Sequence, residues 1–145
     1  MSDTYLRPFV LFAAIGLLLG ACDSTGESPS QQLRYFKFVH PETSGTFVAA
    51  TSEPDVLETL EAQLNKSPEA RNRFIAGPIA RGDAGYNDGH PWHFVEGEWT
   101  LVESAVEVCD GAPSYVDEHV DYFVEEVGRY CPWSARVQKE VKAPR

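Results

Sequence analysis

The chain has 145 residues and a formal net charge of −10, from 12 basic and 22 acidic residues. This length allows one ordinary domain and leaves too little chain for two. A nucleic-acid-binding surface needs clustered lysine and arginine residues to neutralise phosphates, and the sequence has no such cluster, so we expect no nucleic-acid partner. Anionic lipid headgroups are disfavoured for the same reason. Basic proteins, peptides or cations are the partners that this charge favours.

The N-terminal segment predicts a leader followed by a polar tether. Its apolar stretch ends in Leu17-Leu-Leu-Gly-Ala-Cys22, which resembles the lipobox of bacterial lipoproteins. The resemblance implies a lipoprotein signal peptide at residues 1–21, a lipidated Cys22 with a flexible tether at residues 22–33, and a place in the cell envelope facing the periplasm or exterior. The membrane is then contacted through the acyl chains on Cys22. The alternatives are an ordinary signal peptide and a spanning helix, but eleven apolar residues cover only about 16 Å of the roughly 30 Å of bilayer hydrocarbon.

The folded domain is predicted over residues 34–141, followed by a tail at 142–145. Aromatic and β-branched residues predict strands at 34–39 and 45–50, joined as a hairpin by a turn that contains Pro41. A helix is predicted to begin at Ser52 as its N-cap, with a proline in its first turn. Its apolar face carries Val56, Leu57, Leu60 and Leu64.

The middle of the chain predicts short strands and one long loop. Residues 74–80 resemble a strand, which Pro78 confines to an edge or a bulge. Residues 81–91 contain three glycines and no apolar period, which predicts a long exposed loop. Residues 92–95 and 99–102 then predict a tight hairpin.

The C-terminal third predicts a strand, a helix and a final strand. The strand covers residues 105–109, and the helix runs from Pro113 to Gly128 with Asp117 and Glu118 in its first turn, where the helix dipole favours acidic residues. The last strand is expected at 134–141. The predicted fold class is therefore α+β, a small single domain with a mostly antiparallel sheet, two helices and one disulfide.

Two cysteines remain once Cys22 is lipidated. In an oxidising compartment the simple interpretation of Cys109 and Cys131 is one disulfide. It would close a loop of 22 residues, which is worth about 3 kcal/mol in the chain-entropy model. The alternatives are a thiol nucleophile or half of a metal site, although neither cysteine has a close Cys-x-x-Cys partner.

The loop at residues 82–93 is the richest candidate for a ligand site. Asp88, His90 and His93 supply a carboxylate and two imidazoles, a plausible metal-ligand set that suggests a metal-dependent hydrolase as one alternative function. Their spacing differs from the helical zinc motif, and Pro91 excludes a helix. The simpler interpretation is a turn that delivers Trp92 into the core. The candidate ligand-binding residues are Tyr86, Asn87, Asp88, His90, Trp92 and His93.

The other polar and aromatic groups have structural interpretations. The tryptophans Trp92, Trp99 and Trp133 are expected in the core, with stacking on a sugar or a peptide proline as the alternative. No serine lies in a Gly-x-Ser-x-Gly context, so we expect no catalysis and no cofactor. A solvated helix face explains the acidic residues of the second helix, and calcium or a basic partner is the alternative; these residues are Asp117, Glu118, Asp121, Glu125 and Glu126.

Three segments taken together resemble one family. They are Tyr86-Asn87 with Trp92-His93-Phe94, then residues 105–110, then Cys131-Pro132-Trp133-Ser134 with Arg136, Val137 and Glu140. This pattern looks like the N-terminal domain of a calmodulin-binding protein, a family also found as small secreted or lipid-anchored bacterial proteins. The likeness covers residues 36–141. It implies a small disulfide-bonded domain in which Cys109 pairs with Cys131, and it supplies no catalytic residues.

The sequence thus favours a lipid-anchored, extracytoplasmic binding or interaction domain without catalysis. We expect a protein or peptide partner, held through the 82–93 loop and the acidic helix. A metal-dependent hydrolase and a calcium or carbohydrate binding module are the alternatives.

Overall fold

The computed structural model describes residues 32–144. The predicted signal peptide, the lipidation site Cys22 and nearly all of the predicted tether lie outside these residues. Among the residues that are described, no helix is long and apolar enough to cross a membrane. The described chain forms antiparallel sheets, short helices and one disulfide, so the predicted α+β class is confirmed.

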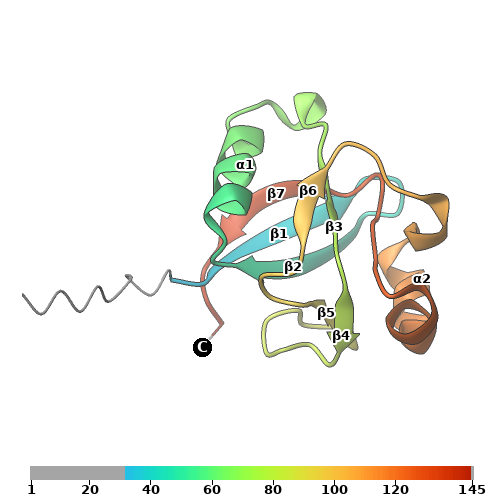
Figure 1. Ribbon diagram of the computed structural model, residues 1–145. Helices are drawn as coiled ribbons and strands as arrows, with labels where there is room; N and C mark the ends of the chain where they lie inside the picture. Colours follow the sequence, from blue (N-terminus) through green and yellow to red (C-terminus); the bar gives the residue numbers. More distant parts are fainter. Residues whose placement is uncertain (1–31, 145) are drawn as a thin grey trace, which may run out of the picture.

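The central sheet has three antiparallel strands in the order β2-β1-β7 (Figure 1). β1 (Arg34–His40) and β2 (Gly45–Thr51) form the predicted hairpin, and β7 (Arg136–Val141) pairs with the other side of β1. Alternation along β1 places Phe36 and Phe38 in the core and leaves Tyr35 and Lys37 partly exposed. The first strand of the domain is therefore the middle strand of its sheet.

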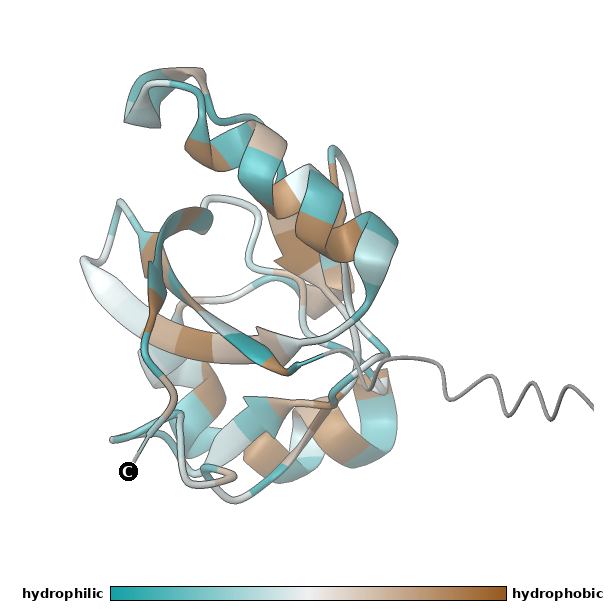
Figure 2. Ribbon diagram, turned by 90° about the vertical axis from the view of Figure 1, so that its left-hand side faces the viewer, coloured by the Kyte–Doolittle hydropathy of each residue, from teal (hydrophilic) through white to brown (hydrophobic). Residues whose placement is uncertain are grey.

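Helix α1 (Pro54–Leu64) follows β2 and contacts β7 and β6. Hydrophobic and hydrophilic residues share its surface (Figure 2), and the four predicted apolar residues are buried or packed against the core. The predicted N-cap is wrong by one residue, because Glu53 occupies the cap position and no side chain caps the helix. A short 3-10 helix, η1 (Pro68–Ala70), comes next, where Pro68 is again the first helical residue.

The segment predicted as one strand at 74–80 belongs to two sheets. β3 (Phe74–Ala76) pairs with β6 (Thr100–Val102), and β4 (Ile79–Arg81) pairs with β5 (Trp92–Phe94). The break lies at Gly77 and Pro78: proline offers no N–H to a ladder, and both backbone groups of Gly77 bond to Tyr130. The hairpin predicted for 92–95 and 99–102 is therefore wrong, because each segment pairs with one half of the broken strand.

The strand predicted at 105–109 is also wrong. Its last three residues form a 3-10 helix, η2 (Glu107–Cys109), and none of the three described sheets includes this segment. The alternation that suggested a strand instead leaves Val106 and Val108 facing solvent, with exposed fractions of 60% and 58%. Only Cys109 is buried. An apolar period of two residues predicts a strand only where a partner strand is within reach.

The second predicted helix is divided into α2 (Pro113–Glu118) and η3 (Tyr122–Val127), and the second piece is a π-helix. His119 separates them with φ −130° and ψ 31°. Its ring Nδ1 lies 2.7 Å from the Tyr115 carbonyl oxygen, the acceptor that a continuous helix would offer to a backbone N–H. Asp117 and Glu118 consequently end a short helix, and their predicted place in a first turn is wrong. Gly128 ends η3 as predicted, with φ 72°.

The core is built largely from aromatic rings. The Trp92 ring centroid lies 5.5 Å from that of Phe47 and 5.2 Å from that of Tyr130. Such aromatic pairs add about 0.5–1.5 kcal/mol each beyond the area that they bury. A smaller cluster beside this core contains Phe74 and the two cysteines.

Candidate functional site

Three of the six candidate ligand-binding residues in the 82–93 loop are buried. Tyr86, Asn87 and Trp92 have exposed fractions of 9%, 1% and 0%. The prediction of a loop exposed throughout is therefore wrong at these positions. His90 and His93 are half-buried, and Asp88 is exposed. The Tyr86 hydroxyl donates to the Phe94 carbonyl oxygen at 3.2 Å, and burial raises the pKa of that hydroxyl.

Side chains of the loop and its neighbour cover an open edge of the central sheet. β2 is an edge strand, so alternate backbone groups on its outer side have no strand partner in the described sheets. Asn87 Oδ1 accepts the Val48 N–H at 2.8 Å. His90 Nε2 lies 2.8 Å from the Thr46 carbonyl oxygen, and Trp99 Nε1 donates to the Ala50 carbonyl oxygen at 2.9 Å. These contacts account structurally for residues that the sequence offered as ligand-binding candidates.

Asp117 connects the same loop to α2. Its Oδ1 accepts the Trp92 Nε1–H at 2.7 Å and lies 2.7 Å from His90 Nδ1. Asn87 Nδ2 donates to the Trp92 carbonyl oxygen, also at 2.7 Å. Asp117 is thus an anchor for the loop rather than part of a solvated helix face. The assignment of the loop as a ligand site stays a prediction, with Asp88 as its freely exposed member.

The proposed metal ligands do not gather around one point. Within residues 32–144, no group of three or more histidine, cysteine, aspartate or glutamate side chains is arranged to hold a metal ion. Both ring nitrogens of His90 face protein oxygens, and His93 Nδ1 lies 2.7 Å from the Gly82 carbonyl oxygen. On the acidic helix, Asp121 and Glu125 both pair with Arg81.

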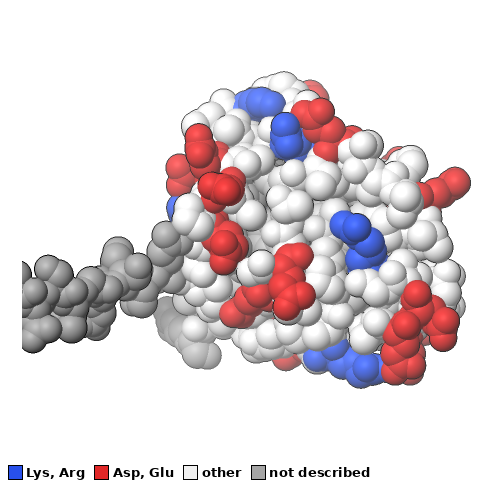
Figure 3. All heavy atoms as spheres, in the orientation of Figure 1, with Lys and Arg blue, Asp and Glu red and all other residues white. Residues whose placement is uncertain are grey.

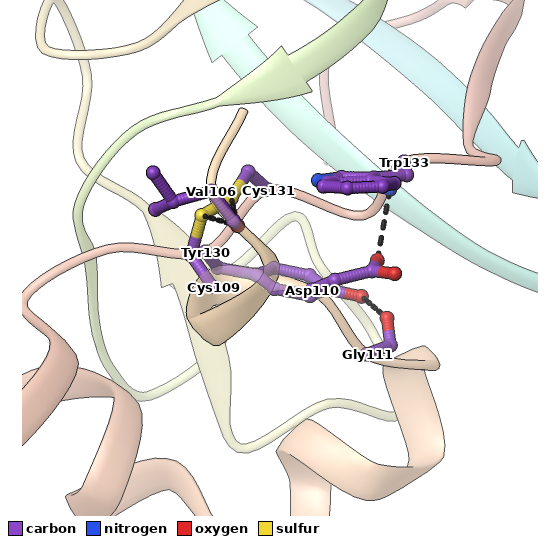
Figure 4. Close-up of a disulfide and its surroundings, with 7 residues drawn as sticks. All are labelled: Val106, Cys109, Asp110, Gly111, Tyr130, Cys131 and Trp133. Atoms are coloured by element: carbon purple, nitrogen blue, oxygen red, sulfur yellow. Dashed lines mark hydrogen bonds between the residues drawn. A yellow bond between two sulfur atoms is a disulfide. The ribbon is translucent and has the colours of Figure 1, made fainter. Parts of the chain in front are cut away.

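The disulfide between Cys109 and Cys131 is present, with a Cα–Cα distance of 5.2 Å (Figure 4). It joins η2 to the segment between η3 and β7, and both cysteines are fully buried. The Cys131 N–H donates to the Cys109 carbonyl oxygen at 2.7 Å. Figure 4 shows the Asp110 carboxylate pointing toward the Trp133 backbone, where its Oδ1 accepts the Trp133 N–H at 2.9 Å. The cross-link therefore fixes the start of the segment that carries Trp133.

The most exposed large apolar side chains lie in or beside the loop that the disulfide closes. Trp133 has an exposed fraction of 40%, whereas Trp92 and Trp99 are buried as expected. The expectation of a core position is wrong for Trp133, because Cys131 and Ala135 occupy the buried positions on either side of it. The other exposed members, among the described residues, are Val106, Val108, Tyr115 and Tyr122. Exposed aromatic and aliphatic groups in one region mark an interaction surface.

Trp133 lines a groove with a volume of about 690 Å³, within the range of about 300–1,000 Å³ typical of ligand pockets. We call it the Trp133 groove. It runs between the turn after β1, the η1 segment and the start of β7, and its walls include Pro41, Glu42, Glu69, Arg71, Trp133 and Arg136. Trp133 and Arg136 also line a smaller hollow of about 210 Å³ beside it.

The two arginines of the groove are bonded to backbone carbonyl oxygens. Arg71 donates to five of them, three at or just after the end of α1 and two on β7. Arg136 donates to the carbonyl oxygens of Arg71, Trp133 and Ala135, and its guanidinium lies 5.7 Å from the Phe74 ring centroid. Burial lowers the pKa of Arg136 from its usual value. The donors of both side chains are therefore directed mainly into the protein.

The carboxylates of the groove are more open. Glu42 and Glu69 are exposed, and neither takes part in an ion pair with a described residue. Glu42 Oε1 accepts only the Ser134 hydroxyl, at 3.2 Å. On the face in Figure 3, acidic side chains form several separate groups around an uncharged centre and outnumber the basic ones. The groove thus offers acceptors to a ligand in a chain whose overall field is negative.

These features define a small disulfide-stabilised α+β domain with a lined groove beside its cross-link. The chain matches the family of the BP-74 N-terminal domain over residues 32–144, and it belongs to this family. The family resemblance and the disulfide pairing that it implied are both confirmed. No curated protein and no solved structure matches the chain.

Proposed function

We propose that this chain is a non-catalytic binding domain, anchored by lipid on Cys22 outside the cytoplasm, which holds a protein or peptide partner in the Trp133 groove. The observation that carries the proposal is an exposed tryptophan, fixed beside a disulfide, on the wall of a groove of about 690 Å³. Tryptophan is among the residues that dominate binding energy at protein interfaces, because it buries much area with few rotatable bonds.

The position of the groove argues for it over the 82–93 loop as the contact surface. Asn87, His90 and Trp92 already bond to β2 and α2, so a partner could recruit them only by opening the fold. The Trp133 Nε1–H, in contrast, has no acceptor among the described residues. A groove whose apolar and polar groups are both free costs less to engage than a network that must first be broken.

Site-specific photo-cross-linking in intact cells tests the proposal. A photoreactive phenylalanine analogue at Ser134, on the groove wall, should cross-link one defined protein, which mass spectrometry identifies. The same analogue at Tyr122, which is also exposed but lies on η3, is the matched control. The purified partner should then bind Trp133→Ala at least about tenfold more weakly than the parent chain. Equal cross-linking from both positions, or unchanged affinity, would overturn the assignment.

The anchor is tested separately. Radiolabelled palmitate should enter the full chain and not the Cys22→Ser variant, and the variant should leave the membrane fraction. Three acyl chains bind far more firmly than one, since each buried methylene adds about 0.8 kcal/mol. A labelled or membrane-bound Cys22→Ser chain would contradict lipidation at this residue.

A further inference from the structure

The Trp133 indole is held in place before any ligand arrives. Its backbone N–H is bonded to Asp110 Oδ1 at 2.9 Å, and its carbonyl oxygen accepts a hydrogen bond from Arg136 Nη1 at 2.5 Å. The disulfide at Cys131 fixes the chain two residues earlier. A fixed, partly exposed aromatic face loses little conformational entropy on binding, and its π-electrons attract cations.

The arrangement of charges decides which ligand suits this face. Formal charges in the groove cancel, since Glu42 and Glu69 oppose Arg71 and Arg136. Their accessibility does not cancel. All five N–H groups of Arg71 are donated to carbonyl oxygens, and three of the five of Arg136 are used in the same way. An anionic ligand would therefore find only Nη2 of Arg136.

Acceptors, in contrast, remain open to a ligand. The Glu69 carboxylate has no ion-pair partner among residues 32–144, and Glu42 accepts one hydroxyl. The formal charge of the chain, −10, adds a long-range attraction for cations. Open carboxylates and an indole face in one groove form the chemical complement of an ammonium or guanidinium group.

Building on the function proposed above, we infer that the Trp133 groove takes a basic segment of the partner, with a lysine or arginine side chain over the Trp133 indole and its charge balanced by Glu42 and Glu69. The walls of Pro41 and Trp133 contact the aliphatic stem of that side chain. The partner is thus a protein with an exposed basic stretch.

Titration of the full chain with short blocked peptides, followed by NMR, tests this chemistry. The probes are tetra-arginine, tetra-glutamate and a neutral Gly-Ser tetrapeptide, and the indole N–H signal of Trp133 is assigned with Trp133→Phe. Tetra-arginine should shift that signal saturably, and the other two should leave it in place. Trp133→Ala, or Glu42→Gln combined with Glu69→Gln, should each weaken tetra-arginine binding about fivefold or more. Glu96→Gln, an exposed carboxylate outside the groove, should bind as the parent does.

The outcomes separate this inference from the proposed function. A shift caused by tetra-glutamate, or by no peptide, overturns the basic-segment assignment. The assignment also fails if Glu42→Gln with Glu69→Gln still captures the cellular partner at full affinity while Trp133→Ala does not; the groove then remains the binding surface. If Trp133→Ala captures the partner normally, the proposed function fails first.

Discussion

Replacing Asn87 with alanine should destabilise the protein more than its position in a loop suggests. The amide side chain has an exposed fraction of 1% and bonds to two backbone groups, the Val48 N–H at 2.8 Å and the Trp92 carbonyl at 2.7 Å. Each group left without a partner costs about 1–3 kcal/mol. Two orphaned groups give about 2–6 kcal/mol, and entry of water into the vacated space reduces this to about 3 kcal/mol.

Urea unfolding of Asn87→Ala beside the parent chain measures this loss. The expected change is a large part of a typical total stability of about 5–15 kcal/mol, at an unchanged dependence on urea concentration. Asp88→Ala is the matched control, because Asp88 is the exposed neighbour in the same turn. Hydrogen exchange adds a local measurement: the Val48 amide should lose protection in the variant. A loss below about 1 kcal/mol, or a Val48 amide that stays protected, would refute the role of Asn87 as a cover for β2.

Three further predictions concern the core and the cross-link. Gly77→Ala places a Cβ 2.5 Å from Trp99 Cβ, so its midpoint of thermal unfolding should fall by the equivalent of about 3 kcal/mol; an unchanged midpoint would mean that the close approach is not maintained. Replacing Cys109 and Cys131 together by alanine should cost about 3 kcal/mol in urea, and a variant as stable as the parent would contradict the structural role of the bridge. Burial raises the pKa of Tyr130 well above its usual value of 10.0, so the stability from its neutral form is complete below that pH and is lost as pH rises further; tyrosinate absorbance from all six tyrosines before the circular dichroism changes would contradict this.

Local sequence signals are sufficient where structure depends on neighbours in the chain. The β1–β2 hairpin and the apolar face of α1 follow from alternation and helical spacing over a few residues. Pro78 correctly indicates an interruption. It cannot reveal that the two halves of the strand enter different sheets, because that choice depends on Tyr130, which bonds to Gly77 across more than fifty positions.

The candidate site is harder to predict, because its residues carry different roles from those that their types suggest. Histidine, asparagine and tryptophan in one glycine-rich loop resemble a ligand site, yet the same groups serve as hydrogen-bond partners for an edge strand. The size of Trp133 alone predicts a core position. The signal that could have corrected this is its place directly after Cys131-Pro132, where a cross-linked cysteine takes the buried position and the chain must turn.

The order of strands in the central sheet has a consequence for how the chain acquires its structure. β1 lies between β2, its immediate successor, and β7, the last strand of the domain. The hairpin can close early, but its second flank stays open until nearly the whole chain has been synthesised. Arg71 makes the same demand, since two of its acceptors lie on β7. A chain shortened before Arg136 should therefore be unable to complete its fold, and the intact one becomes cooperative only when its two ends meet.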